Sequence, residues 1–447
     1  MGSYIPSTPQ QRQEMLKAIG LSSFRELYGD VPAEMYLDRP LNIPSGMSEL
    51  EVGRAVRAMA DRNRVYDVIL RGAGAYDHYI PSIVKYIPAK EEFLTAYTPY
   101  QAEMSQGLLQ SIFEYQTMIC MLTGMDVSNA SVYDGATAAA EAAAMCRERK
   151  RRVTLISGAA HPDTINTVRT YCYGTGDEMR IVPEKDGRTD LDALREMLTT
   201  DVASFYVQQP NFHGLFEDAE TLGAAVHKAG ALYVMGCNPM ALAIMKTPRD
   251  CGADIAVGSL IKNPGGGIAP TGGYIVGRKD LVELCAYRLN APGLGKELGC
   301  TLETPRDMYL GFYYAPGVVC EAIKTAIYAQ CMLELLGKKP IPRYCEDHND
   351  IVTCFDAGTA EALIGFCQGI QAASPVDSYA APEPSPEPGY TDEVVMASGS
   401  FTQGSTIELS CDGPLRAPYT CYLQGGLNFA ASRAGVLLAV QKAYFKE

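Results

Sequence analysis

RVTLISGAAHPDTINTVRTYCYGTGDEMRIVP, residues 152–183, is the stretch that decides the fold. Its first run, RVTLIS (152–157), is short and rich in β-branched residues, which predicts a strand. The segment HPDTINTVRTYCYG (161–174) predicts a helix, and MRIVP (179–183) predicts a second strand. A helix that joins two short apolar strands is typical of a parallel sheet whose strands are buried on both faces.

The same alternation continues on both sides of this stretch. Upstream, the alanine-rich segment 135–151 favours a helix. Downstream, helices are predicted over 189–200, with Thr189 as the N-cap, and over 217–230, ending on Gly230; strands are predicted over 203–208, 231–236, 254–261 and 272–278. This order predicts an α/β protein with a doubly wound, mostly parallel sheet.

The sequence divides into three regions. Residues 1–70 carry amphipathic helical patterning, and residues 71–295 form the predicted large α/β domain. After residue 295 the alternation is lost, and residues 296–447 predict a smaller C-terminal α+β domain with a long helix over 315–337. A proline- and glutamate-rich segment, 379–390, is expected to be an exposed loop of this domain.

The composition is that of a soluble globular protein, and it excludes several classes of function. Of the 447 residues, 47% are hydrophobic and 20% are charged, and the formal net charge is -14. A chain this acidic has no basic field to attract phosphates, so nucleic acid is not an expected partner. The sequence contains no apolar signal segment at its start and no stretch that could span a membrane, so a cytoplasmic protein is expected. The 14 cysteines form no CxxC pair and have no metal-ligand spacing to the five histidines, so reduced thiols are expected and no metal site.

Lys262 stands among small residues in GSLIKNPGGGIAPTGG (258–273), just after a predicted strand. Ligands of doubly wound sheets bind at the carboxyl ends of the strands, which is where this lysine is expected. A reachable amine with small neighbours suits a Schiff base to a flat aldehyde cofactor, pyridoxal 5'-phosphate. The alternative is a solvated lysine in a surface loop, but the position at a strand end favours a catalytic role for Lys262.

A pyridoxal phosphate site also needs an anchor for the phosphate, and SVYDGATAAAEA (131–142) is a candidate. Small residues at the start of a helix leave backbone N–H groups free to bind an anion. The candidate residues are Ser131, Gly135, Ala136 and Thr137. An ordinary capped helix would have the same pattern.

Three further residues have positions suited to the cofactor ring or the substrate. His161 follows the strand 152–157 and either stacks on the pyridine ring or is a structural histidine. Asn238 ends the strand before the lysine strand, where a carboxylate would keep the ring nitrogen protonated; a neutral amide can hydrogen-bond the ring but cannot hold that proton. Arg416, in LSCDGPLRAPYTCYLQGG (409–426), is a candidate for binding an amino-acid carboxylate, or else a surface arginine.

The first part of the chain contains long and specific motifs. They include GAGAYDHYIPSIV (72–84), TAYTPYQAEMSQGLLQSIFEYQTMICMLTGMDVSNASVYDGATAAAEA (95–142) and VQQPNFHGLFED (207–218). With them, residues 1–258 resemble the alpha subunit of split glycine dehydrogenase, the P-protein of the glycine cleavage system. The resemblance implies pyridoxal phosphate-dependent decarboxylation of glycine and transfer of the aminomethyl group to the lipoyl group of H-protein. It also implies a beta subunit as partner, and in that family the beta subunit carries the cofactor lysine.

The second part of the chain carries motifs of a different kind. They include GSLIKNPGGGIAPTGGYIVGR (258–278), FCQGIQAASPVDSY (366–379) and IELSCDGPLRAPYTCYLQGGL (407–427). With them, residues 259–447 resemble the methionine gamma-lyase-like family, whose members are also labelled aluminium-resistance proteins. In that family the lysine that matches Lys262 is implied to hold the cofactor. Both families have the fold type I architecture of pyridoxal phosphate enzymes, so the chain resembles a hybrid whose parts meet near 258/259.

The two resemblances imply different functions. The principal hypothesis is a glycine dehydrogenase subunit. The alternative is a stand-alone pyridoxal phosphate-dependent carbon–sulfur lyase, similar to methionine gamma-lyase or cystathionine lyase, that uses Lys262 and holds the substrate carboxylate with Arg416. A third hypothesis is an inactive structural partner subunit. Because fold type I sites are usually shared between two chains, a dimer or larger oligomer is expected.

Overall fold

The structure is a computed structural model that describes residues 7–37, 39–70, 78–94, 102–238, 245–290, 295, 305–347, 350–374, 377–398 and 407–445. The chain forms two compact units, Met1–Ile80 and Pro81–Glu447. The three-part division predicted from the sequence, with boundaries at 70/71 and 295/296, remains a prediction.

The first unit is built from short helices. Its α-helices are α1 (Pro9–Ala18) and α2 (Glu49–Ala60), as the amphipathic patterning predicts. Each begins with a capping box, in which the hydroxyl of Thr8 or Ser48 accepts a hydrogen bond from the backbone three residues later. Two 3₁₀ turns, η1 (Phe24–Tyr28) and η2 (Ala33–Met35), lie between them.

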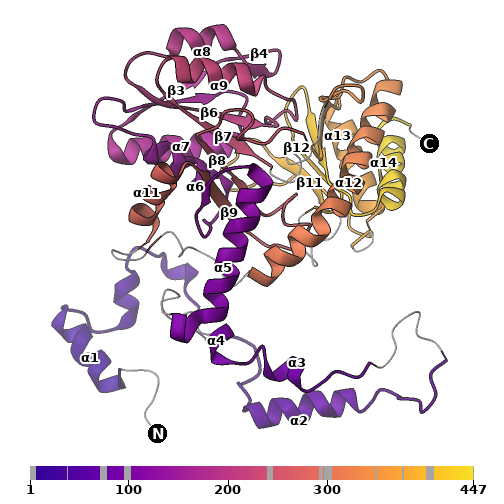
Figure 1. Cartoon of the computed structure of the whole chain (residues 1–447). Helices are drawn as coiled ribbons and strands as arrows, with labels where there is room; N and C mark the ends of the chain where they lie inside the picture. Colours follow the sequence, from indigo (N-terminus) through magenta and orange to yellow (C-terminus); the bar gives the residue numbers. More distant parts are fainter. Residues whose placement is uncertain are drawn as a thin grey trace. The chain divides into compact units, whose positions relative to one another are not determined.

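The second unit contains a seven-stranded sheet in the order β1-β9-β8-β7-β6-β2-β3 (Figure 1). The strands are β1 (Val127–Ser128), β2 (Val153–Ser157), β3 (Glu178–Val182), β6 (Val202–Gln209), β7 (Leu232–Cys237), β8 (Ile255–Ser259) and β9 (Gly273–Gly277). Strands β3, β2, β6, β7 and β8 pair in parallel, whereas β9 is antiparallel to both β8 and β1. The prediction of a doubly wound, mostly parallel sheet is confirmed.

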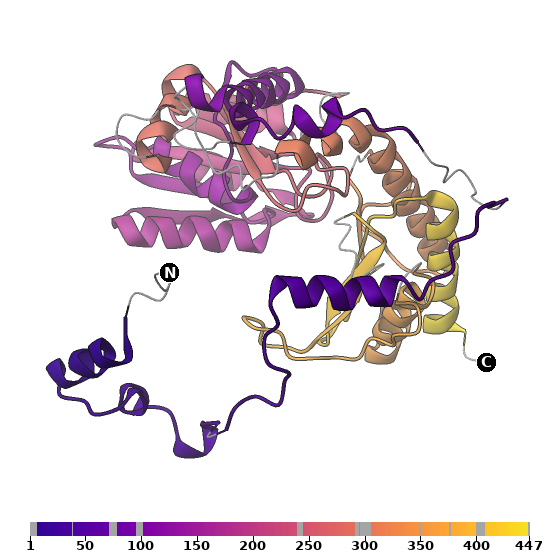
Figure 2. The ribbon, with the colours of Figure 1, turned by 90° about the horizontal axis from the view of Figure 1, so that it is seen from below.

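Helices cover both faces of this sheet, which explains why its central strands are largely apolar and buried. Successive residues of one strand enter opposite cores: Phe205 and Val207 lie in one core, and Tyr206 lies in the other. The first core also contains side chains of α5 (Ala102–Thr123), α8 (Leu191–Met197) and α9 (Ala219–Lys228). The second contains side chains of α6 (Gly135–Met145), α7 (Pro162–Thr175) and α11 (Lys279–Leu289) (Figures 1 and 2).

The C-terminal part forms a smaller α+β domain around a four-stranded antiparallel sheet, in the order β10-β13-β12-β11. Its elements are α12 (Pro305–Leu335), β10 (Val352–Asp356), α13 (Ala360–Ala372), β11 (Val394–Ser398), β12 (Ser410–Pro414), β13 (Thr420–Gln424) and α14 (Phe429–Tyr444). α13 and α14 pack on one face of the sheet and close an apolar core. The predicted loop 379–390 contains no helix and is largely exposed.

Short elements complete the second unit. They are α3 (Ile83–Tyr86), α4 (Glu91–Leu94), and a two-stranded ribbon of β4 (Glu184–Lys185) and β5 (Arg188–Thr189). Among the described residues, no helix combines the length and the apolar character that crossing a bilayer requires.

One predicted helix start is wrong. Thr189 is not the N-cap of α8; Asp190 is, and its Oδ1 accepts from the N–H groups of Asp192 at 2.9 Å and Ala193 at 3.1 Å. Thr189 belongs to β5 instead, and its own N–H donates to the buried carboxylate of Glu217 at 3.0 Å. This long-range bond decides the role of Thr189, and the local sequence does not encode it.

Candidate active site

The candidate site lies at the edge of the large sheet where parallel strands end. β2, β6, β7 and β8 are adjacent and parallel, so their carboxyl ends share one edge. His161 follows β2, Asn238 follows β7 and Lys262 follows β8. The structure therefore gathers these three predicted residues at the edge where sheets of this type bind ligands.

Helix α6 begins beside the end of β8. Asp134 caps the helix: its Oδ1 accepts from the N–H of Thr137 at 2.7 Å, and Thr137 Oγ1 accepts from the N–H of Asp134 at 3.2 Å. Gly135 packs so closely that a Cβ on it would lie 2.9 Å from the backbone nitrogen of Ser259. The start of α6 is thus held against the strand that leads to Lys262.

The start of α6 fits a phosphate only in part. Gly135, Ala136 and Thr137 are half-buried at a helix N-terminus, where aligned peptide dipoles favour an anion. The N–H of Thr137 already binds the carboxylate of Asp134, which places a negative charge at the same helix end. Ser131 lies buried in the preceding turn, and its carbonyl accepts from Asn129 Nδ2 at 3.1 Å. A phosphate here would use the N–H groups of Gly135 and Ala136.

Lys262 is half-buried, and burial lowers the pKa of its ammonium below the ordinary lysine value. The carboxylates of Asp412 and Asp350 raise this pKa, but burial has the larger effect. A lowered pKa increases the fraction of neutral amine, which is the form that attacks a carbonyl carbon. The electrostatic environment therefore suits a nucleophilic lysine.

The small domain contributes two acids to this environment. Asp412 lies on β12, and burial, together with the neighbouring Cys367, raises its pKa to about 6, while Lys262 lowers it. Asp350 lies just before β10, and its Oδ1 accepts from Asn263 Nδ2 at 3.3 Å. An acid with a pKa near neutrality can exchange protons with an amine beside it.

His161 is held at the start of α7 by bonds on both sides. Its N–H donates to Gln208 Oε1 at 2.9 Å, and its Nδ1 accepts from the N–H of Asp163 at 3.1 Å. Because Nδ1 is an acceptor, the neutral ring carries its proton on Nε2. Burial lowers the pKa of His161, so the neutral form is favoured.

An aromatic contact joins His161 to the small domain. The ring of Phe212 lies edge-on to His161, with 5.0 Å between ring centroids, and 5.6 Å from the ring of Tyr422 on β13. Tyr422 pairs directly with Asp412 across the strands, so both side chains are on the same face of the small sheet. That face is therefore turned toward the strand ends of the large domain.

Asn238 and Arg416 differ in how closely the structure holds them. Asn238 is half-buried directly after the end of β7. Arg416 is exposed in the turn between β12 and β13, where its Nη1 donates to Asp392 Oδ2 at 3.1 Å. Binding of a substrate carboxylate by Arg416 remains a prediction, and Asp392 would have to release the guanidinium first.

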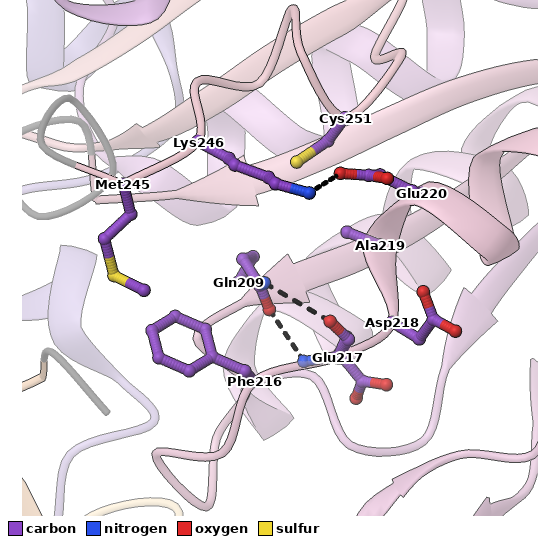
Figure 3. A pocket seen from close by; sticks show the side chains of 9 residues that line it. All are labelled: Gln209, Phe216, Glu217, Asp218, Ala219, Glu220, Met245, Lys246 and Cys251. Atoms are coloured by element: carbon purple, nitrogen blue, oxygen red, sulfur yellow. Dashed lines mark hydrogen bonds and ion pairs between the residues drawn. The ribbon is translucent and has the colours of Figure 1, made fainter. Parts of the chain in front are cut away.

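A separate pocket of about 460 Å³ lies on the large domain where β6 ends (Figure 3). It is lined by Gln209, Phe216, Glu217, Asp218, Ala219, Glu220, Met245, Lys246 and Cys251. Lys246 is paired with Glu220, and the side-chain amide of Gln209 bonds both backbone groups of Glu217. The acidic lining of this pocket opposes phosphate binding.

Sequence reasoning identified Lys262 but missed its acidic neighbours. Asp412 stands four residues before Arg416 in the same motif, LSCDGPLRAPY, so the motif itself was the available signal. Asp350 and Phe212 gave no signal, because their roles depend on contacts between distant segments.

The sheet order, the lysine after β8 and the helix start beside it define a fold type I enzyme of the pyridoxal phosphate class. The family model of the glycine cleavage system P-protein matches residues 2–276, and that of methionine gamma-lyase matches residues 225–444. The chain belongs to the glycine cleavage system P-protein family. The resemblance to both families is confirmed, and because the two matches overlap over residues 225–276, the join near 258/259 remains a prediction. Both families depend on pyridoxal phosphate.

Curated relatives support this membership. The chain is 44% identical over 347 residues to probable glycine dehydrogenase (decarboxylating) subunit 1 of Carboxydothermus hydrogenoformans, covering 75% of this chain and 78% of that protein. The protein of the same name in Moorella thermoacetica is 46% identical over 290 residues, covering 64% of this chain and 65% of that one.

Solved structures of both kinds resemble the chain. An inhibitor-bound glycine decarboxylase (P-protein) of the glycine cleavage system covers 98% of this chain and 100% of that chain, with 26% identity and a TM-score of 0.58. A carbon-sulfur lyase involved in aluminum resistance from Clostridium novyi NT covers 81% of this chain and 99% of that one, with 28% identity and a TM-score of 0.61.

Proposed function

We propose that this chain is a subunit of glycine dehydrogenase (decarboxylating). The complete enzyme would decarboxylate glycine and pass the aminomethyl group to the lipoyl group of H-protein. The observation that carries the proposal is the 44% identity to the Carboxydothermus subunit 1 over 347 residues. The name of that relative supports a partner subunit, for which we propose a glycine dehydrogenase beta chain. The acidic composition and the lack of a spanning helix among the described residues are consistent with our proposal of a cytoplasmic location.

Pyridoxal phosphate, when bound, supplies an electron-withdrawing ring that stabilises the negative charge left when glycine loses its carboxylate. The N–H groups of Gly135 and Ala136 would bind the phosphate, and His161 would lie against the ring. Asn238 would hydrogen-bond the ring nitrogen without holding a proton on it. In the P-protein family the beta subunit carries the cofactor lysine, so Lys262, whose pKa is lowered by burial, would offer a further amine to the cofactor aldehyde.

In this site Asp412 would exchange protons with the amine of Lys262. Its pKa of about 6 allows both protonation states near neutral pH, so it can receive a proton from the ammonium or return one. Both Asp412 and Lys262 are half-buried, which would limit the access of water to this exchange.

A second candidate function is a carbon–sulfur lyase of the methionine gamma-lyase or cystathionine lyase kind. The observation that favours it is the lysine itself, half-buried at the strand end with a lowered pKa, inside the segment matched by the methionine gamma-lyase model. In that case Arg416 would hold the substrate carboxylate. An inactive structural partner subunit is the third candidate.

The test begins with the purified chain, supplied with pyridoxal phosphate and then reduced with borohydride. Peptide mapping would locate any covalently fixed cofactor. Lys262→Ala is the test variant, and Lys246→Ala is the matched control, because Lys246 is an exposed lysine outside the site. Glycine–bicarbonate exchange is measured with and without the beta chain and H-protein, and ammonia release is measured with cystathionine and methionine.

The outcomes separate the three functions. Exchange that requires the beta chain and H-protein supports the glycine dehydrogenase subunit. Ammonia release by the chain alone that disappears in Lys262→Ala supports the lyase and overturns the first proposal. Exchange by the beta chain and H-protein that is the same with and without this chain, together with no ammonia release, supports the inactive partner.

A further inference from the structure

The core of the small domain contains three cysteines on three different elements. Cys367 lies on α13, Cys411 on β12 and Cys421 on β13, and all three are fully buried. The Sγ of Cys411 is 3.4 Å from the Sγ of Cys367, and the three sulfurs lie within 4.8 Å of one another. We refer to these residues as the thiol cluster.

Strand register and helix packing bring the sulfurs together. Cys411 pairs with Leu423 and Asp412 with Tyr422, so Cys411 and Cys421 lie on the same face of the sheet, opposite to Asp412. This is the face that α13 covers, and Cys367 projects from that helix into the same core. The thiols of Cys411 and Cys421 hydrogen-bond Cys367 and lower its pKa, whereas burial raises the pKa of the other two.

The spacing of the sulfurs suits one central atom bound to all three. Two thiolates on the same ion, with bonds of about 2.3 Å, lie no more than about 4.6 Å apart. The 3.4 Å between Cys367 and Cys411 is within this limit, and the 4.8 Å bound on the cluster exceeds it only slightly. Closing around an ion therefore requires little movement.

The charge of the surroundings restricts what the cluster can hold. Among the described residues, the charged group that acts on these thiols from outside is Asp412, which is an acid and would repel a negative complex. Three thiolates leave a net charge of about -1 on a divalent ion and about -2 on a monovalent one, and burying such a charge without a partner is costly. A zinc ion would also need a fourth ligand, and the group of ligand side chains found here has three members.

We propose that the thiol cluster binds a soft trivalent ion of the arsenite or antimonite class through three sulfurs. Arsenous acid, As(OH)3, exchanges its three As–O bonds for three As–S bonds. Each thiol proton leaves with one hydroxyl as water, so three waters are released and no electron is transferred. The product is neutral and three-coordinate, which matches three ligands in an apolar core that lacks a compensating cation.

The experiment uses the full chain, reduced, with sodium arsenite as the probe. We expect one arsenic per chain after dialysis, three sulfur neighbours around it in the X-ray absorption spectrum, and an increase in the unfolding temperature. Cys367→Ala, Cys411→Ala and Cys421→Ala should each weaken arsenite binding by about tenfold or more. Antimonite should behave like arsenite, whereas cadmium should bind more weakly because its complex is charged.

Two control variants keep the test specific. Cys285→Ala removes a buried cysteine of the large domain and should leave arsenite binding unchanged. Cys345→Ser removes an exposed thiol near Cys331, where a surface pair could bind arsenite with two sulfurs. Loss of binding in Cys345→Ser but not in Cys421→Ala would overturn the proposal, as would a sulfur coordination number of two. If a cluster variant fails to fold, the number of sulfur neighbours in the wild type and the comparison with cadmium still show whether the thiol cluster binds the trivalent ion.

Discussion

Gly135 and Ser259 set the distance between α6 and β8, since a Cβ on Gly135 would lie 2.9 Å from the nitrogen of Ser259. Gly135→Ala should push the helix start away from the strand, weaken pyridoxal phosphate binding, and lower the free energy of unfolding by about 1–3 kcal/mol. Cofactor titration and urea unfolding measure both effects. In Gly174→Ala, the matched control on α7, the added methyl meets no atom within 4 Å, so cofactor affinity should not change. Equal cofactor affinity and equal stability of the two variants would contradict the close contact between Gly135 and Ser259.

Removing the carboxylate of Asp412 should lower the pKa of Lys262 further, because Asp412 raises that pKa in the wild type. The pH at which pyridoxal phosphate can be trapped on Lys262 by borohydride should therefore shift downward in Asp412→Asn. Asp392→Asn, which removes the surface partner of Arg416, is the control and should leave this pH unchanged. An unchanged profile in Asp412→Asn would show that the two groups do not interact.

Asp412 also predicts a specific pH dependence of stability. Its pKa is about 6 in the folded chain and 3.8 as the reference value, so the folded state binds the proton more tightly. This group therefore adds stability as the pH falls from about 6 toward 4, by at most about 3 kcal/mol, and the contribution is lost as the pH rises through 6. Asp412→Asn does not titrate, so in urea unfolding the wild type should be less stable than this variant above pH 6, and the difference should shrink as the pH falls toward 4. A constant difference would be inconsistent with the raised pKa.

Asp177 should be far more important for stability than an exposed aspartate in a similar pair. Its side chain is 1% exposed and is bound by Arg147 and Arg152. Asp177→Asn leaves both guanidinium groups without their anion and should cost about 3–5 kcal/mol in urea unfolding. Asp192→Asn breaks the exposed pair with Arg195 and should change stability by no more than about 0.5 kcal/mol. Similar losses of unfolding free energy in Asp177→Asn and Asp192→Asn would contradict the greater importance of the buried aspartate.

Asn238→Asp tests the position proposed for the cofactor ring nitrogen. A carboxylate there would hold a proton on the ring, and a charge-assisted bond exceeds a neutral one by about 1 kcal/mol, so the exchange of the α-proton of a bound amino acid should become about fivefold faster. Exchange into heavy water, followed by NMR, measures this rate. Asn211→Asp, at a buried asparagine elsewhere in the large domain, should give no increase. A slower rate in Asn238→Asp would place the ring nitrogen elsewhere.

The local pattern of apolar and polar residues predicts most helices and strands of the large domain. It fails where contacts between distant segments decide the structure. Most strands and helices between 153 and 277 follow from apolar runs and helix signals, but the ribbon of β4 and β5 does not. The sequence predicts that the long helix of the small domain begins at residue 315. α12 instead begins at Pro305 and includes Pro316. Its earlier part is held by tertiary packing, in which Gly311 lies directly against the backbone of Gly265.

The same limit applies to the candidate site. His161, Asn238 and Lys262 could be predicted together because parallel strand ends share one edge. Asp412 could not be connected to Lys262, since they are 150 residues apart and belong to different sheets. The thiol cluster was missed for the same reason: spacings of 44 and 10 residues between its members match no ligand motif.

β9 lies between β1 and β8 in the large sheet, and both family models match residues 225–276, which include β8 and most of β9. A chain that ended at the predicted join, residue 258, would leave β1 without its neighbour in the sheet and β8 without its antiparallel partner. Any ancestral recombination at this point had to conserve strand register on both sides, and swapping either half for that of a distant relative would succeed only under the same constraint.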